Sequence, residues 1–233
     1  MTNYIWWNAR RAVRHPSVVR PSHLGQLISS YLTARGREVS PTVFVGALTG
    51  CGGYYAMAAV DSNTLPSELR RFKRDCIFGL VRAVRPEVVV ETGCGAGYTT
   101  THILEAMRLN GHGVLYSIDS AEHFNPSYYG YPPGLPCGGV VPEHLKDSNW
   151  HLSMGGAEQE LLLILEGLGK IDLFIHDSLH TRGQMSLEIR TAWPYLREGG
   201  VLVAHDVWKP FGDFAHTVSR EYVVSQHFGG VVK

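Results

Sequence analysis

Two clusters of histidine and aspartate in the second half of the chain carry side chains that do acid–base and metal chemistry. The first holds His176, Asp177 and His180, and the second holds His205 and Asp206. Imidazole changes charge near neutral pH and acts as a general base, and imidazoles with carboxylates also hold divalent cations with open water positions. A third interpretation is that His176 and His205 are hydrogen-bonded core residues and only the aspartates act. The residues alone leave all three open.

A glycine-rich segment, ETGCGAG, follows an apolar run and precedes a predicted helix. Gly93, Gly95 and Gly97 allow the backbone to approach a ligand closely, and the helix behind them offers free amide donors. Dinucleotide-binding turns have the spacing GxGxxG, but their third glycine would fall here at Tyr98, which would obstruct helix–strand packing. Glu91 brings in a carboxylate, which suits a cationic amino group better than a pyrophosphate. The turn therefore favours a ligand with an amino group over a dinucleotide.

A second acidic position supports this interpretation. Asp119 ends the next apolar run about twenty residues after the turn, where a carboxylate accepts hydrogen bonds from both hydroxyls of a ribose. The turn and Asp119 together predict a site for a nucleoside that carries a charged amino group.

Apolar periodicity then indicates which elements position these residues. It predicts helices over 67–84, 98–110, 157–168 and 183–196, and strands over 87–91, 114–118, 171–176, 201–205 and 228–233. Alternating strands and helices predict an α/β fold with a doubly wound, mostly parallel sheet. Because parallel strands end at one edge, the turn and both histidine–aspartate clusters should meet there.

Residues 1–65 lack this alternation and are interpreted as an N-terminal helical cap, with the catalytic domain over 66–233. The charge balance of 21 basic and 21 acidic residues removes the electrostatic argument for a nucleic-acid partner. The uncharged segment 41–60 is interpreted as a pocket wall rather than a membrane span. Four dispersed cysteines fit a reduced, cytoplasmic setting. A homodimer is compatible with these features.

The segment 120–147 is long, irregular and rich in tyrosine and proline. Connections of this length in a compact domain are usually lids or binding loops, with a passive insertion as the alternative. Tyr128, Tyr129 and Tyr131 either cover an aromatic acceptor or only pack the loop.

Four ordered motifs, VVVETGCGAGYTT, LYSIDS, IDLFIHDSLHT and LREGGVLVAHDV, resemble those of class I S-adenosylmethionine (SAM) methyltransferases. Within that class they resemble the small-molecule group called methyltransferase family 24. The resemblance runs from about residue 69 to 233. It implies a Rossmann-like methyltransferase fold, SAM as cofactor, and O-methylation of a small hydroxylated natural product.

The resemblance also assigns the cofactor contacts. The residues concerned are Glu91, Gly93, Gly95, Gly97, Asp119, Ser120, Gly156, Ala157 and Asp177. Where the family often has an acid for the adenine amino group, this chain has SMGGA, residues 153–157. A backbone amide there, or Glu158 or Gln159, is the expected adenine contact.

Carried over from catechol and caffeoyl-CoA O-methyltransferases, the resemblance implies a site for Mg²⁺ or another divalent cation at Asp177, His205 and Asp206. In the alignment with those enzymes, Asp177 matches a metal-binding aspartate by its offset from Asp172. His205 stands where those enzymes have another metal-binding aspartate, but a one-residue gap in the alignment would put Asp206 at that position instead. Without metal, His180 or His205 would be the general base beside Asp177. Two other activities remain as alternatives: SAM binding without methyl transfer, cyclase-like or ligand-gated, and a nicotinamide-dependent oxidoreductase, whose GxGxxG and Tyr-x-x-x-Lys motifs are absent.

Overall fold

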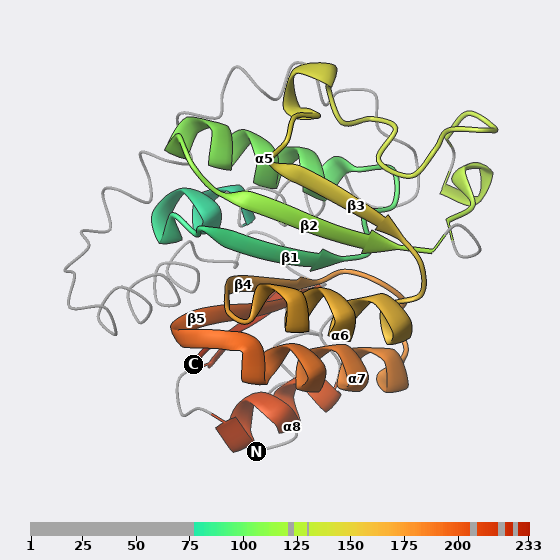
Figure 1. Ribbon diagram of the computed structural model, residues 1–233. Helices are drawn as coiled ribbons and strands as arrows, with labels where there is room; N and C mark the ends of the chain where they lie inside the picture. The colour runs from blue at the N-terminus through green and yellow to red at the C-terminus, as the bar shows by residue number, and fades with distance from the viewer. Residues whose placement is uncertain (1–76, 121–123, 130, 206–208, 219–221, 226–227) are drawn as a thin grey trace.

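The computed structural model describes residues 77–120, 124–129, 131–205, 209–218, 222–225 and 228–233 (Figure 1). The N-terminal cap predicted over 1–65 lies outside these residues, as does the start of the helix predicted over 67–84. Residues 77–84 are helical, in agreement with the end of that helix.

A seven-stranded sheet forms the centre of the structure, in the order β3-β2-β1-β4-β5-β7-β6. Its strands are β1 (Val88–Thr92), β2 (Val114–Asp119), β3 (Trp150–Met154), β4 (Ile171–His176), β5 (Leu196–His205), β6 (Tyr222–Ser225) and β7 (Phe228–Val232). The first five pair in parallel, and β7 pairs antiparallel with both β5 and β6. The predicted doubly wound, mostly parallel sheet is confirmed.

Helices cover both faces of this sheet (Figure 1). On one face, α5 (Tyr98–Asn110) and residues 77–84 bury an apolar core with β1, β2 and β4. On the other face lie α6 (Ala157–Leu168), α7 (Arg182–Ala192) and α8 (Lys209–Val218). Short 3₁₀ turns occupy Pro126–Tyr129, Glu143–Leu145 and Trp193–Tyr195. Among the described helices, none has the length and apolar character to cross a membrane.

Several element boundaries differ from the sequence prediction. The helix predicted over 183–196 ends at Ala192, because Pro194 cannot donate to a continuing helix and a 3₁₀ turn follows. Strand β5 begins at Leu196, before the predicted start, and its pairing with β4 is irregular between Ile171 and Leu173. The prediction omitted β3, α8 and β6.

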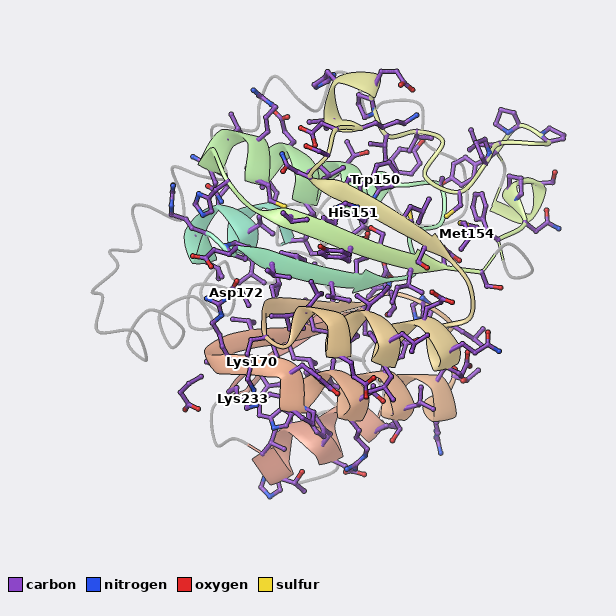
Figure 2. All side chains as sticks on the ribbon, viewed as in Figure 1. Trp150, His151, Met154, Lys170, Asp172 and Lys233 are labelled. Carbon is purple, nitrogen blue, oxygen red and sulfur yellow. The ribbon has the colours of Figure 1, made fainter. Side chains whose placement is uncertain are left out.

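Strand β3 was missed because it is an edge strand with partly exposed side chains rather than an apolar run. Figure 2 shows Trp150, His151 and Met154 along it. The indole of Trp150 donates to the Ser117 hydroxyl at 3.0 Å, and the His151 ring stacks on Tyr116 with centroids 4.8 Å apart. Side-chain contacts with β2 thus hold this strand on the sheet.

At the amino-terminal edge of the sheet, Asp172 fixes the start of β1 (Figure 2). This aspartate is buried, and its Oδ2 accepts hydrogen bonds from the backbone amides of Glu87 and Val88 at 2.8 and 2.9 Å. Its Oδ1 lies 3.0 Å from the guanidinium Nε of Arg197. One carboxylate therefore joins β1, β4 and β5 at the edge opposite the predicted site.

Replacing Asp172 with alanine should lower the free energy of unfolding by about 3 kcal/mol, because two amides and Arg197 lose a charged acceptor. Urea unfolding measures this change. Glu166→Ala, which removes an exposed carboxylate from α6, is the matched control and should stay within about 0.5 kcal/mol of the parent protein. Equal unfolding midpoints for the two variants would contradict this role.

Candidate active site

The predicted functional residues gather at the carboxyl edge of the sheet, where the strand order reverses between β1 and β4. Ligands of doubly wound folds bind at this point, because the loops diverge there to opposite faces. The amide of Asp177 donates to the Thr92 carbonyl at 2.9 Å, and the amide of Gly93 donates to the Ile118 carbonyl at 2.8 Å. The ends of β1, β2 and β4 are thus held in contact.

The three glycines of the turn have different structural roles, although all three have positive φ angles. A Cβ on Gly93 would lie 2.1 Å from the Asp177 carbonyl oxygen, and one on Gly97 would lie 2.7 Å from the Val141 side chain. Among the described residues, the nearest atom to a Cβ on Gly95 would be a Phe124 ring carbon at 4.0 Å. Gly93 and Gly97 are therefore required for packing inside the protein, whereas no described residue crowds the position of a Cβ on Gly95.

Asp119 lies beside Gly95, as the prediction of a ribose-binding acid requires. Its Oδ2 accepts a hydrogen bond from the Gly95 amide, and its Oδ1 accepts one from the Ser120 amide at 2.7 Å. A carboxylate has about four acceptor positions, so this one retains capacity for ligand hydroxyls. The contacts of these residues with a cofactor stay a prediction.

Glu91 is fully buried beneath the turn. Its Oε2 accepts hydrogen bonds from the hydroxyls of Thr100 and Ser117, each at 2.8 Å, and so connects β1 with α5 and β2. Its predicted contact with an amino group stays a prediction.

The Cys94 thiol lies near Glu91. A hydrogen bond between Cys94 and Cys137, together with burial, raises the pKa of the Cys94 thiol far above its ordinary range, so this thiol stays protonated.

The predicted adenine side lies next to Asp119. The amide of Gly155 donates to the Asp119 carbonyl at 2.8 Å, and Gly156 is the residue before the first turn of α6. Gly156 and Ala157 are partly buried, whereas the side chains of Glu158 and Gln159 are exposed. The backbone of this segment therefore shares an edge with the ribose-binding position.

Asp177, His180 and His205 come together on the other side of the turn. The Oδ1 of Asp177 lies 2.8 Å from Nδ1 of His205, and its Oδ2 accepts a hydrogen bond from the Thr99 hydroxyl at 3.2 Å. The rings of His180 and His205 have centroids 5.3 Å apart, and one nitrogen or oxygen from each of the three side chains lies within 4.8 Å of the others. The structure thus groups the three residues predicted to be catalytic.

His176 and Asp206 are the remaining residues of the two histidine–aspartate clusters. His176 is fully buried under α7, with Nδ1 2.6 Å from Oε2 of Glu188, so the interpretation as a core histidine holds for His176. His205, by contrast, is partly exposed at the edge of the sheet. Asp206, predicted as a metal ligand, lies outside the described residues.

Glu188 is a buried acidic residue that the sequence prediction did not identify. Burial alone would raise its pKa, but the hydrogen bond and charge of His176, with hydrogen bonds from Ser178 and Thr92, outweigh burial and hold the pKa below its usual value. The available signal was its helical spacing: Met185, Glu188 and Ile189 occupy the buried face of α7, while Leu187 is exposed.

The described part of the segment 120–147 packs directly on the glycine turn. The amides of Gly138 and Val140 donate to the carbonyls of Gly95 and Ala96 at 2.9 and 3.0 Å, and the Tyr131 ring lies 5.8 Å from that of Tyr98. The segment is thus positioned beside the predicted cofactor site. Its role as a lid stays a prediction, and the side chains of Tyr128 and Tyr129 lie outside the part of the structure that is described.

A family model described as a methyltransferase domain matches residues 90–207, just over half of the chain. The protein belongs to this methyltransferase family. The match includes the glycine turn, Asp119 and the segment with Asp177 and His205, and it identifies the chain as a class I SAM-dependent methyltransferase. This family membership disagrees with the nicotinamide-dependent alternative and favours methyl transfer over SAM binding alone.

Solved structures show the same fold. The Podospora anserina methyltransferase PaMTH1, bound to S-adenosylhomocysteine (SAH), is 12% identical to this chain with a TM-score of 0.53. The match covers 83% of this chain and 89% of the PaMTH1 chain. An O-methyltransferase from Bacillus cereus in complex with SAH is 13% identical with a TM-score of 0.53, covering 98% and 100%.

A third structure, the MycE methyltransferase from the mycinamycin biosynthetic pathway in complex with Mg and SAH, is 16% identical with a TM-score of 0.51, covering 80% and 54%. At such identities these likenesses establish the fold and leave the substrate open. No curated protein sequence matches the chain.

Glycine-to-alanine variants separate packing from ligand access. Gly93→Ala should lower the free energy of unfolding by about 3 kcal/mol or more, because the new methyl group overlaps the Asp177 backbone and φ stays positive. Gly95→Ala should cost about 1 kcal/mol, from backbone strain alone. Urea unfolding measures both, and similar losses would show that the close crossing at Gly93 is not the constraint.

Proposed function

We propose that the protein transfers a methyl group from SAM to a hydroxyl of a small natural-product acceptor. The observation that carries this proposal is the 2.8 Å contact between Asp177 and His205 at the switch point, beside the glycine turn. A hydroxyl is a weak nucleophile until its proton is removed, so O-methylation requires a base or a Lewis acid next to the donor methyl group. This pair is positioned to supply the base.

The proposed mechanism assigns proton removal to His205. With Nδ1 facing the Asp177 carboxylate, the Nε2 of His205 is the nitrogen that accepts the acceptor's proton, and the carboxylate stabilises the resulting imidazolium. Thr99, in the first turn of α5, holds the other oxygen of Asp177 and so fixes its orientation. His180 lies beside the pair with an exposed ring and borders the space for the acceptor.

The cofactor is proposed to lie across the glycine turn and to supply an electrophilic methyl group on its sulfonium. The carboxylate of Asp119, held by the amides of Gly95 and Ser120, would hold its ribose side. Gly156 and Ala157 would hold its adenine side. This placement is supported by the direct hydrogen bond between Gly95 and Asp119 and by the lack of close contacts at Gly95 within the described part of the chain.

A small acceptor, rather than a nucleic acid, is favoured by two features. The chain has no net formal charge, so its overall charge gives no electrostatic argument for a phosphate backbone as partner. Leu179, which is half exposed, is the chain neighbour of His180 and offers an apolar side chain beside that histidine. This combination suits an acceptor that has a carbon skeleton as well as a hydroxyl.

Calorimetric titration with SAH, followed by methyl-transfer assays on a panel of hydroxylated small molecules, tests this function. His205→Ala should lower kcat by about 100-fold to 10,000-fold because it removes the base, while SAH affinity is retained. Asp119→Ala should instead weaken SAH binding. His144→Ala removes an exposed histidine and is the control. Absence of SAH binding to the parent protein would contradict the proposed function.

A divalent cation is a second candidate for activating the acceptor, favoured by the grouping of Asp177, His180 and His205 within 4.8 Å. One carboxylate and two imidazoles fit Mn²⁺, Fe²⁺ or Zn²⁺, whereas Mg²⁺ prefers oxygen ligands. Among the described residues His180 is the third member of this group, and the predicted ligand Asp206 lies outside them. A cation held here would lower the pKa of an acceptor hydroxyl. MycE, a structural relative, was solved with Mg.

Metal titration of chelator-treated protein distinguishes the two mechanisms. The cation mechanism predicts one Mn²⁺ or Zn²⁺ site per chain by calorimetry, lost in Asp177→Ala and weakened at least about tenfold in His180→Ala. It also predicts that methyl transfer stops after chelation and resumes with metal. Full activity in the chelated protein would rule out the cation and leave His205 as the base.

A further inference from the structure

Glu188 on α7 is a fully buried carboxylate whose acceptor positions are all used. Its Oε2 accepts hydrogen bonds from the Thr92 hydroxyl and, at 2.6 Å, from Nδ1 of His176. Its Oε1 accepts hydrogen bonds from the Ser178 hydroxyl and, at 2.8 Å, from the side-chain amide of Gln184. Four donors match the four acceptor positions of one carboxylate.

The partners of Glu188 lie next to the residues of the proposed mechanism. Thr92 directly precedes Gly93 of the turn, while His176 and Ser178 flank Asp177 on either side. Glu188 therefore holds the end of β1 and both neighbours of Asp177 from a single point on α7. None of these contacts includes Asp177 itself.

Stability alone does not account for a carboxylate at this position. Burying a charge carries a large desolvation cost, and replacing a complete buried ionic pair with apolar side chains is often neutral or stabilising. The surroundings of Glu188 on α7 are apolar, with Met185 and Ile189 both fully buried in the same layer. A leucine would suit such a layer, so the geometry that the carboxylate imposes is its distinguishing property.

We propose that Glu188 is a positioning residue for methyl transfer. By holding Thr92, His176 and Ser178, it sets where the Asp177 carboxylate and its partner His205 lie relative to the glycine turn. This proposal rests on the proposed function, in which the position of His205 relative to the glycine turn sets the distance between the donor methyl group and the base. A displacement of about 1 Å in such an arrangement can reduce the rate about 100-fold.

Two variants and a control test this role. The double variant Glu188→Leu with His176→Leu removes the buried pair but leaves the buried Thr92 hydroxyl without its acceptor, so it should fold but unfold at a somewhat lower urea concentration than the parent protein. Its kcat should fall about 100-fold, with the acceptor KM and SAH affinity changed by less than about threefold. Glu188→Gln, which keeps the shape and one acceptor oxygen, should recover part of kcat. Glu105→Gln, a buried carboxylate paired with Arg108 within α5, should leave kcat unchanged.

Wild-type kcat in the folded double variant would overturn the proposal, as would a loss of kcat that only follows the unfolded fraction. If the double variant does not fold, Thr92→Val and Ser178→Ala each remove one hydroxyl donor and should each lower kcat without changing SAH affinity.

Amide hydrogen exchange gives a measurement that does not depend on turnover. Segments 92–97 and 176–178 should exchange faster in Glu188→Gln than in the parent protein, while α5 exchanges at the same rate. If the parent protein methylates no hydroxylated molecule, the proposed function fails, and the exchange result still decides whether Glu188 holds the two loops. Unchanged exchange in both segments would overturn that role.

Discussion

The organisation of the site depends on the close crossing of two loops at the centre of the sheet. The turn after β1 and the segment after β4 approach so closely that a single methyl group on Gly93 would overlap the Asp177 carbonyl oxygen. This approach places the proposed base on one side of the turn and Asp119 on the other. Glycine permits it by having no side chain and by accepting a positive φ angle at low cost.

Carboxylates on both faces of the sheet maintain this crossing. Glu91, on the α5 face, accepts hydrogen bonds from Thr100 and Ser117, and Glu188, on the α7 face, accepts four. Asp119 accepts hydrogen bonds from two backbone amides at the carboxyl edge of the sheet. Because buried carboxylates are costly without donors, each constrains the residues around it strongly. The donors are mostly hydroxyls and amides, which fix geometry without adding positive charge.

The sequence predicted the elements that have strong local signals. Helices 98–110 and 157–168 agree with the structure because glycine flanks each of them at both ends, and the strand 171–176 agrees because it is a short, largely apolar run buried on both faces. Edge elements were missed. Strand β3 has the mixed sequence WHLSM, and α8 follows β5 without a strong start signal, so only pairing and packing with the rest of the chain define them.

For the site, residue types and spacing pointed to the glycine turn, Asp119, Asp177, His180 and His205. The resemblance of four motifs pointed to the methyltransferase family. All of these features are local in the chain. Tertiary structure decided what no local pattern contains. It assigned His176 to the core and His205 to the edge, although both end apolar strands. It also showed that Gly93 and Gly97 serve packing, that no described residue crowds Gly95, and that Glu188 forms hydrogen bonds with residues of both loops. The physical reason is that these roles depend on contacts between segments distant in sequence, which exist only once the sheet has formed.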